Sequence, residues 1–287
     1  MIANEVFFHV VRITGILLSR FLFLLLYYII RYRRRVVRIN LQKAFSSPHL
    51  TDIEKKFYLN LSEMPFEILL ALIMPAKNLN KLVRFNNFQV ILESAKKSNC
   101  FVFGLIGHFM NWELIGIALP FLIKDVAIPA SLYRKQSIIF VNRIIELIRE
   151  RTGALLIPEQ HLYRNLLKLK ENKGKKYFVC VVGDQTPLLT QKHIWTDFLG
   201  IETPFYSWWV KIVKREDAPV FYGSIKKEKF ARYSVNIEII SEEPASETEE
   251  SLLKKYVNFL ERDIKKTPEL WLWSHRRWKR IPDFYKT

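Results

Sequence analysis

Short apolar runs that alternate with longer segments constrain the fold of this chain more than any other feature. The runs have the length and the β-branched and aromatic content of buried strands, and the segments between most of them are long enough for helices. The expected strands are residues 100–106, 126–132, 154–157, 177–182, 219–225 and 233–240, and the expected helices are residues 112–123, 137–151, 160–171, 205–215 and 248–264. This alternation predicts an α/β fold with a mostly parallel central sheet flanked by helices.

A separate apolar segment precedes that part of the chain. Residues 13–30 read "ITGILLSRFLFLLLYYII", in which Arg20 is the one charged residue. A central arginine costs about 2.5 to 3.5 kcal/mol on insertion, whereas about a dozen Ile, Leu and Phe residues each return about 0.3 to 0.6 kcal/mol, so the membrane is favoured. At about 1.5 Å per residue the segment is about 27 Å long, which leaves both a spanning helix and a helix in the membrane interface open.

Basic residues follow the apolar segment at once, in "RYRRRVVR" at 31–38. Such a cluster marks its side of the membrane as cytoplasmic and contacts anionic headgroups, although an ordinary solvated charge run is the alternative. We therefore expect a membrane-anchoring helix with a basic segment at residues 1–40, and the main domain at residues 41–287, on the cytoplasmic face. Residues 40–75 read as helical, with a capping box at Thr51 and Glu54 and a kink or break at Pro65.

Charge and cysteine content narrow the possible partners. The net charge of +17 indicates a polyanionic partner, which is a nucleic acid, an anionic membrane surface or a phosphorylated substrate. Cys100 and Cys180 both lie inside apolar runs, which is typical of buried thiols in a reducing compartment. We expect neither a disulfide nor a metal site.

The motif "GHFMNWE" at 107–113 contains the strongest candidates for catalysis. On one continuous helix His108 and Glu113 would lie about 140° apart, so they can meet only across a bend. A strand ending near Gly107 and a helix beginning near Asn111 or Trp112 supply that bend. His108 then acts as a general base, and Glu113 holds its second ring nitrogen protonated. The alternative is a turn histidine with Glu113 favouring the helix N-terminus.

Further candidates follow other expected strands. Arg134 comes after the second strand, where the carboxyl ends of parallel strands form a crevice, and the motif "VVGDQTP" places Asp184 and Gln185 at the end of a very apolar strand. Candidates for binding a phosphate or carboxylate are Arg143, Arg149 and Arg151. For Arg143 a solvated helix face is the preferred interpretation, and a turn role for "GDQTP" is open.

Near the C-terminus "LWLWSHRRWKRIP" interleaves aromatic and basic residues. Such a segment can stack nucleobases, anchor at a membrane interface or bind headgroup phosphates through residues such as Arg276. The apolar N-terminal segment favours a function at the membrane. For His275 we expect a structural role.

Several catalytic motifs are absent from the sequence. It has no G-x-S-x-G elbow, no glycine-rich phosphate loop, no G-x-G-x-x-G and no Cys and His spacing typical of zinc. What remains is a base that removes a proton from a bound hydroxyl, which then attacks an activated partner directly.

The motifs together resemble one family over residues 10–282. They are "YRRRVVRINLQKAF", "GHFMNWE", "YRKQ" with "RERTG", "GDQTP", "FLGIETPF", "REDAPV" and "LWLWSHRRWKRIP". In this order they resemble the late lauroyl or myristoyl acyltransferases of bacterial lipid A biosynthesis. That family is part of a wider group of glycerolipid acyltransferases that carry a His, four residues, then Asp or Glu.

The resemblance implies an O-acyltransferase of the inner membrane. It would move a fatty acyl chain from acyl-acyl carrier protein, or acyl-CoA, to a hydroxyl of a lipid A precursor, without a cofactor. His108 would be the base with Glu113 as its partner, and Arg149 and Asp184 fall at positions where the family carries functional residues. The implied partners are acyl carrier protein, an anionic lipid acceptor and the membrane, with no nucleic acid.

Other functions are also open from the sequence. An acyltransferase of the same fold could use another lysolipid, a glycolipid or an aminolipid as acceptor. A basic membrane-binding protein without catalysis is a second class, and a nucleic-acid binder is a third. The apolar segment at residues 13–30 argues against the third.

Overall fold

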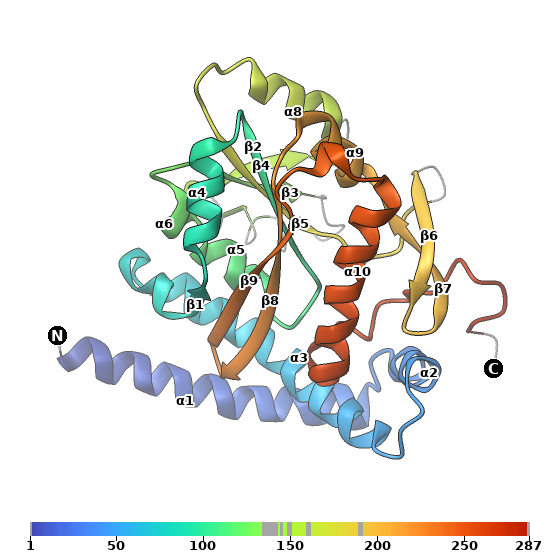
Figure 1. Cartoon of the computed structure of the whole chain (residues 1–287). Coiled ribbons are helices and arrows are strands. Elements are labelled where there is room, and N and C mark those ends of the chain that lie inside the picture. Colours follow the sequence, from blue (N-terminus) through green and yellow to red (C-terminus); the bar gives the residue numbers. More distant parts are fainter. Residues whose placement is uncertain are drawn as a thin grey trace.

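The structure is a computed structural model that describes residues 2–133, 143, 146–147, 151–158, 162–188 and 192–285. Within these ranges seven strands form the central sheet, in the order β1-β9-β8-β2-β5-β3-β4 (Figure 1). They are β1 (Val83–Asn86), β2 (Phe101–Ile106), β3 (Ile128–Tyr133), β4 (Leu155–Pro158), β5 (Tyr177–Val182), β8 (Val220–Lys229) and β9 (Arg232–Ser241). The strands from β8 to β4 are parallel, whereas β9 is antiparallel to β8 and β1 is parallel to β9. The predicted α/β fold with a mostly parallel sheet is confirmed.

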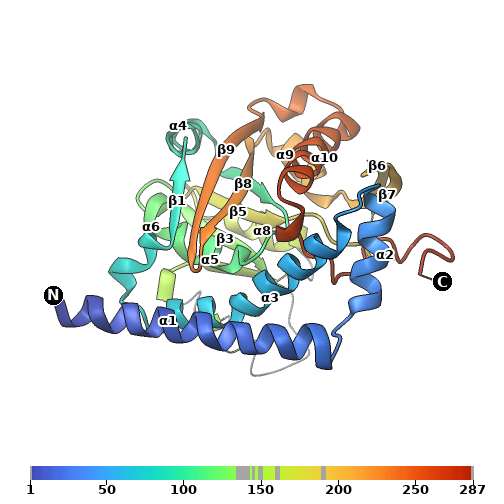
Figure 2. The same ribbon diagram turned by 90° about the horizontal axis from the view of Figure 1, so that it is seen from below.

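Helices cover both faces of the sheet. Helix α10 (Glu249–Lys266) packs on β8 and β9, where Tyr222 stacks on Phe259 and donates a hydrogen bond of 3.0 Å to Asp263. The opposite face is covered by α3 (Leu50–Ile73) and α5 (Trp112–Ala118), as Figure 2 shows. Further helices within the described part of the main body are α4 (Gln89–Lys97), α6 (Pro120–Ile123), α8 (Leu162–Lys170) and α9 (Trp208–Glu216), with 3-10 turns η2 (Ala76–Lys81), η3 (Pro244–Ser246) and η4 (Pro268–Leu270).

A hairpin outside the central sheet corrects one predicted helix. Strands β6 (His193–Phe198) and β7 (Ile201–Tyr206) pair antiparallel, and the turn between them has positive φ at Leu199 and Gly200. The helix expected at residues 205–215 therefore begins only at Trp208 in α9. Apolar residues at 205 and 206 fit either element by periodicity, and the ladder with β6 decides for the strand.

Helix α3 differs from its prediction in two ways. Of the kink or break predicted at Pro65, the break is wrong, because packing against α1 and α5 outweighs the cost of about 3 kcal/mol for a proline inside a helix and α3 is continuous. The capping box is also wrong, since the helix begins at Leu50 and Glu54 accepts hydrogen bonds from Arg34 (2.6 Å) and Arg38 (2.9 Å) instead. Part of the basic segment is thereby fixed to the body through a carboxylate.

The N-terminal helix lies along the body. α1 (Ile2–Leu24) continues into a π-helical turn, η1 (Leu25–Ile29), and residues from Phe8 to Ile29 are long and apolar enough to cross a membrane. One side of α1 packs on α3, and the ring of Phe230 from the β8–β9 turn approaches Gly15 (Figure 2). Arg20 lies 3.6 Å from Glu63 of α3, so the charge inside the apolar segment has a partner.

The basic helix α2 (Arg34–Ala44) connects the N-terminal arm, which consists of α1 and η1, to the C-terminal segment at residues 268–285. Asn40 is fully buried, and its amide donates to the carbonyl oxygens of Trp273 (2.8 Å) and His275 (2.9 Å). Arg33 donates to the carbonyl of Ser274 (3.1 Å). The predicted division between two units at residue 40 falls inside α2 and stays a prediction.

Candidate active site

Two neighbouring strands bring the central side chains of the site together. In the parallel pair β2–β5, Ile106 is in register with Val182. His108 and Asp184 each come two residues after these positions, and each follows a glycine, Gly107 or Gly183. Because the two chains leave the sheet at the same level, the equal offset places histidine and aspartate side by side.

Asp184 holds His108 by two contacts. Its Oδ1 contacts Nδ1 of the imidazole, and its Oδ2 accepts a hydrogen bond of 2.8 Å from the backbone N–H of His108. The same Oδ2 accepts a third bond of 2.6 Å from Nε1 of Trp271. Burial alone would raise the pKa of the Asp184 carboxyl, but the charge of His108 and these hydrogen bonds outweigh it and lower the pKa to about 2.

Gln185 contacts the other nitrogen of the ring. Its amide nitrogen lies 2.9 Å from Nε2 of His108. An amide N–H can only donate, so Nε2 accepts and the ring proton is on Nδ1, facing Asp184. This tautomer leaves the lone pair of Nε2 directed away from the aspartate, as general-base catalysis requires.

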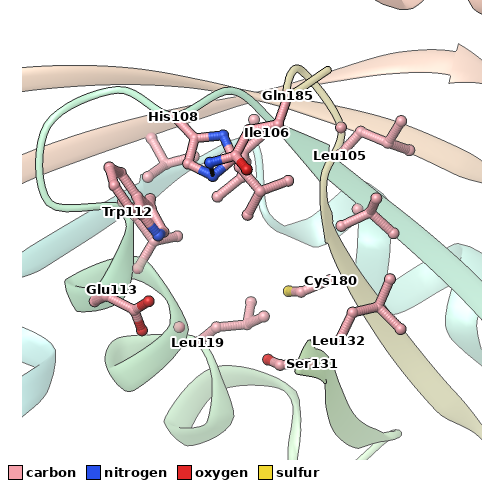
Figure 3. Close-up of a pocket in the computed structure, with 18 of the residues that line it drawn as sticks. Leu105, Ile106, His108, Trp112, Glu113, Leu119, Ser131, Leu132, Cys180 and Gln185 are labelled. Carbon is pink, nitrogen blue, oxygen red and sulfur yellow. Dashed lines mark hydrogen bonds between the residues drawn. The ribbon is translucent and has the colours of Figure 1, made fainter. Parts of the chain in front are cut away.

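The predicted role of Glu113 as the carboxylate that holds His108 is therefore wrong, because Asp184 takes that place. Asp184, which the sequence placed at the end of a strand as a candidate for substrate binding, is the carboxylate that contacts the ring. Asn111 has a left-handed backbone (φ 57°) and precedes α5, and Figure 3 shows Glu113 on this helix apart from the His108 ring, beyond Trp112. Glu113 lines the same cavity as His108 (Figure 3), so its part in catalysis stays a prediction.

The C-terminal segment packs against residues 107–111, the loop that carries His108, here called the histidine loop. The backbone N–H of Met110 donates to Leu270 O (2.8 Å), that of Leu272 donates to His108 O (3.0 Å), and Phe109 forms an isolated bridge with Trp271. Trp271, Trp273 and Trp278 are all buried. The prediction that these aromatic residues anchor at a membrane interface is thus wrong, since they pack inside the protein and fix the loop.

A second support comes from α3. Glu67 is fully buried and accepts a hydrogen bond of 2.7 Å from the side-chain amide of Asn111, which fixes the turn between His108 and α5. Glu67 also accepts from Tyr233 (2.7 Å) and from the backbone of Ala231 (2.8 Å), and Lys227 lies 3.1 Å from it. Sequence reasoning missed both Glu67 and Trp271.

A cavity of about 1010 Å³ opens beside His108, between the sheet and helices α3 and α5. Its lining is mainly apolar, with a few polar groups beside the histidine. Residues that line it include Leu61, Met64, Phe66, Leu69 and Leu72 of α3, Trp112, Glu113, Gly116 and Leu119 after β2, and Gly104, Ser131, Cys180, Phe221 and Val235 of the sheet. Its size and its mainly apolar lining with a few polar groups beside His108 are typical of a site for an apolar ligand with a polar reactive group.

The family comparison agrees with this geometry. Residues 7–280 match the model of the family described as bacterial lipid A biosynthesis acyltransferase. The chain belongs to this family. No curated protein sequence matches the chain. The predicted resemblance is confirmed, and membership supports an enzyme that transfers acyl groups and associates with a membrane.

The predicted arginines of this acyltransferase have different outcomes. Arg151 donates to the carbonyl oxygens of Leu72 and of Met74 (2.8 Å), so it caps the C-terminal end of α3. Arg143 is exposed and lies 3.6 Å from Glu146, as the preferred interpretation expected. Substrate binding by Arg151 stays a prediction. Arg134 and Arg149 lie outside the described residues.

The residues after Trp273 lie behind the acyltransferase site, where His275 contacts Thr186 of the cavity lining. Nε2 of His275 accepts a hydrogen bond of 3.3 Å from the backbone of Thr186, and burial with the nearby charge of Arg277 lowers the His275 pKa to about 4. Arg277 is fully buried, donates to Pro204 O (2.8 Å) and lies over the ring of Phe205. Arg276 is exposed beside Tyr285, and its predicted contact with substrate stays a prediction.

Neither cysteine of the acyltransferase is fully buried, contrary to the prediction. Cys100 and Cys180 are both half-buried, and Cys180 lines the cavity. Within the described ranges no group of His, Cys, Asp and Glu side chains has an arrangement that could hold a metal ion.

Proposed function

We propose that this protein transfers a fatty acyl chain from acyl-acyl carrier protein to a hydroxyl group of a lipid A precursor. The observation that carries the proposal is the arrangement at His108, whose Nδ1 faces the buried Asp184 carboxylate while the side chain lines an apolar cavity. A neutral imidazole held in this tautomer is a general base. A thioester donor is already activated, so the reaction needs no protein nucleophile.

The proposed reaction has two steps at one carbonyl carbon. Nε2 of His108 takes the proton from the acceptor hydroxyl as the hydroxyl oxygen attacks the thioester carbon. The tetrahedral intermediate then collapses, the C–S bond breaks, and the thiolate leaves with the proton from His108. Asp184 stabilises the imidazolium between these steps, because its ionised carboxylate already faces Nδ1.

Gln185 and Glu113 have separate proposed roles. The Gln185 amide lies beside Nε2 of His108 and lines the cavity, so it can donate to the attacking oxygen or to the oxyanion. Glu113 lies on the cavity wall, in the first turn of α5, where it can accept a hydrogen bond from the bound acceptor.

The exposed side of α1 supports a membrane as partner. Large apolar side chains on it are exposed to solvent in the isolated protein, namely Val10, Ile13, Leu17, Leu18, Phe21 and Leu24. Leu69 of α3 is 53% exposed and also lines the cavity, so lipid could enter from this side. Because the other side of α1 packs on α3, a helix embedded in the interface fits better than an isolated span. The basic segment supports the cytoplasmic face of the inner membrane as the proposed location of this surface.

Charge supports the other two partners. Acyl carrier protein is acidic and a lipid A precursor carries phosphates, and a chain with a net charge of +17 attracts both. The proposal includes neither a nucleic-acid partner nor a cofactor.

Purified protein in detergent tests the proposal. Acyl-acyl carrier protein and a tetra-acylated lipid A precursor are supplied, and products are read by mass spectrometry. The expected product gains one acyl chain, and His108→Ala lowers the rate by roughly 10²- to 10⁴-fold. A lysophospholipid, a glycolipid and an aminolipid are offered in parallel. If acyl transfer occurs to one of these lipids alone, that lipid is the acceptor and the proposed lipid A acceptor is wrong. A His108→Ala variant that retains activity would refute the mechanism.

A further inference from the structure

Gly116 leaves a gap in the helix side of the cavity. A Cβ atom built at this position would meet no atom within 4 Å. Gly223, on the sheet, is different because a Cβ there would lie 2.9 Å from the side chain of Ile106. The space beside Gly116 is therefore open, whereas the space above the sheet glycine is already filled by a neighbour.

The helix orders the cavity residues by depth. Glu113, Gly116 and Leu119 follow one another at intervals of three residues on α5 and its extension, about 4.5 Å apart along the axis. Because α5 starts at the histidine loop, each step leads away from the reacting carbonyl. Figure 3 shows Leu119 on the far side of the cavity from His108.

On the sheet side of the cavity, small residues lie at a similar distance from His108. Ser131 of β3 is in register with Cys180 of β5, and Cys180 is in register with Gly104 of β2. These positions lie two residues before Val182, or about 6.6 Å back along the strands. Ser131 and Cys180 are small and lie across the cavity from His108 in Figure 3, whereas the ring of Phe178 occupies the space beside Gly104.

We propose that Gly116, with Ser131 across the cavity, determines how long an acyl chain the enzyme accepts. The inference rests on the proposed function, in which the thioester carbonyl lies at His108 and the chain extends along the cavity. Later methylenes of a long chain then fill the space that the missing side chain at residue 116 leaves. A methylene that fits or fails to fit an apolar pocket changes specificity by about 10-fold or more.

Two substitutions fill this space from opposite sides. Gly116→Leu adds a side chain where no atom lies within 4 Å and replaces a poor helix former by a good one, so the helix should be retained. Ser131→Leu reduces the same space from the sheet. Ser131→Ala removes the hydroxyl without adding volume and is the matched control.

The experiment compares kcat/KM for saturated acyl-acyl carrier proteins from octanoyl to octadecanoyl, within each preparation. Gly116→Leu and Ser131→Leu should each lower the ratio of the longest to the shorter donors by about 10-fold or more, and Ser131→Ala should keep the wild-type order of donors. Damage to the fold lowers all donors together and leaves the ratio unchanged. An unchanged preference in either folded leucine variant overturns the inference.

Binding of free fatty acids provides a readout without turnover. Trp112 lines the cavity, so its fluorescence should report occupancy by acids of graded length. The leucine variants should lose affinity for the long acids first. If wild-type protein transfers no acyl chain but still shows this shift, the proposed function fails while the inference about the cavity holds. Equal loss for all lengths would refute the inference.

Discussion

Asp184 and Glu113, the carboxylates associated with His108, lie in different surroundings. Asp184 is 2% exposed and accepts hydrogen bonds from the backbone of His108 and from Trp271, besides its contact with the ring. Glu113 is half-buried on a cavity wall beside apolar side chains. A carboxylate enclosed by donors is fixed and stays ionised, whereas one at a cavity surface can meet a ligand. The difference favours Asp184 as the group that orients the base, and contact of Glu113 with substrate stays a prediction.

Removing the charge of Asp184 should have the largest effect. In Asp184→Asn the amide can donate to Nδ1 and so force the proton onto Nε2, which is the wrong tautomer for a base. We expect kcat to fall by roughly 10³- to 10⁴-fold, as a comparable change does in a serine protease. Steady-state kinetics measure this, with thermal unfolding to verify the fold. A loss of less than tenfold would show that Asp184 does not orient the base.

Glu113→Gln should have a smaller effect. The amide keeps the size of the side chain but loses a charged acceptor, which is worth about 10- to 100-fold in kcat/KM if it contacts the substrate. Kinetics with the acceptor varied at fixed donor measure this loss. The contrast between the carboxylates breaks down if this variant is as inactive as Asp184→Asn.

Trp271→Phe tests the enclosure of Asp184. The variant loses the Nε1 donor, so the pKa of Asp184 should rise and kcat should fall by about tenfold, with a loss in stability of about 1.5 to 3 kcal/mol. Trp273→Phe is the matched control, because Nε1 of Trp273 donates to Pro268 O (2.6 Å) and not to Asp184. The control should lose stability and keep kcat. Equal kcat losses in both variants would reduce Trp271 to a packing role.

Counted per pH unit, the effect of pH on stability should be the smallest. Both His275 (pKa about 4 folded, 6.5 ordinarily) and Asp184 (about 2 folded, 3.8 ordinarily) have lowered pKa values, so the unfolded chain binds protons first as pH falls. The free energy of unfolding should fall as the pH falls from 6.5 to 4 through His275, and from about 3.8 to 2 through Asp184. Each group contributes a slope of up to about 1.4 kcal/mol per pH unit.

Urea unfolding at a series of pH values measures these slopes. His275→Asn should flatten the upper range alone, because the amide oxygen can still accept from Thr186 but does not titrate. An unchanged slope in that range would exclude His275 as its source.

The sequence was sufficient for those parts of the structure that depend on local pattern. Six strands of the central sheet, the apolar N-terminal helix and the bend at Gly107 all follow from periodicity and turn residues, whereas β1 was not predicted. The hairpin β6–β7 was missed because its apolar residues fit a helix equally well, and Pro65 did not break α3 because tertiary packing outweighs its local cost.

The partner of His108 could not be found in this way. Asp184 is 76 residues away, and only the order of the strands makes β2 and β5 neighbours. One signal was present, since "FVFGLIGH" and "YFVCVVGD" are both apolar runs that end in a glycine and a functional residue. Glu67 and Trp271 gave no such signal, because their role depends on contacts between distant elements.

The hydrogen bonds of Asn40 have a practical consequence for handling the protein. They join α2 to the backbone on either side of Ser274, two residues beyond the segment that holds the histidine loop. Cutting away the first helices to gain a water-soluble enzyme would remove this brace and leave buried carbonyl groups unsatisfied. Extraction with detergent, keeping the whole N-terminal arm, is therefore the route that preserves the chemistry.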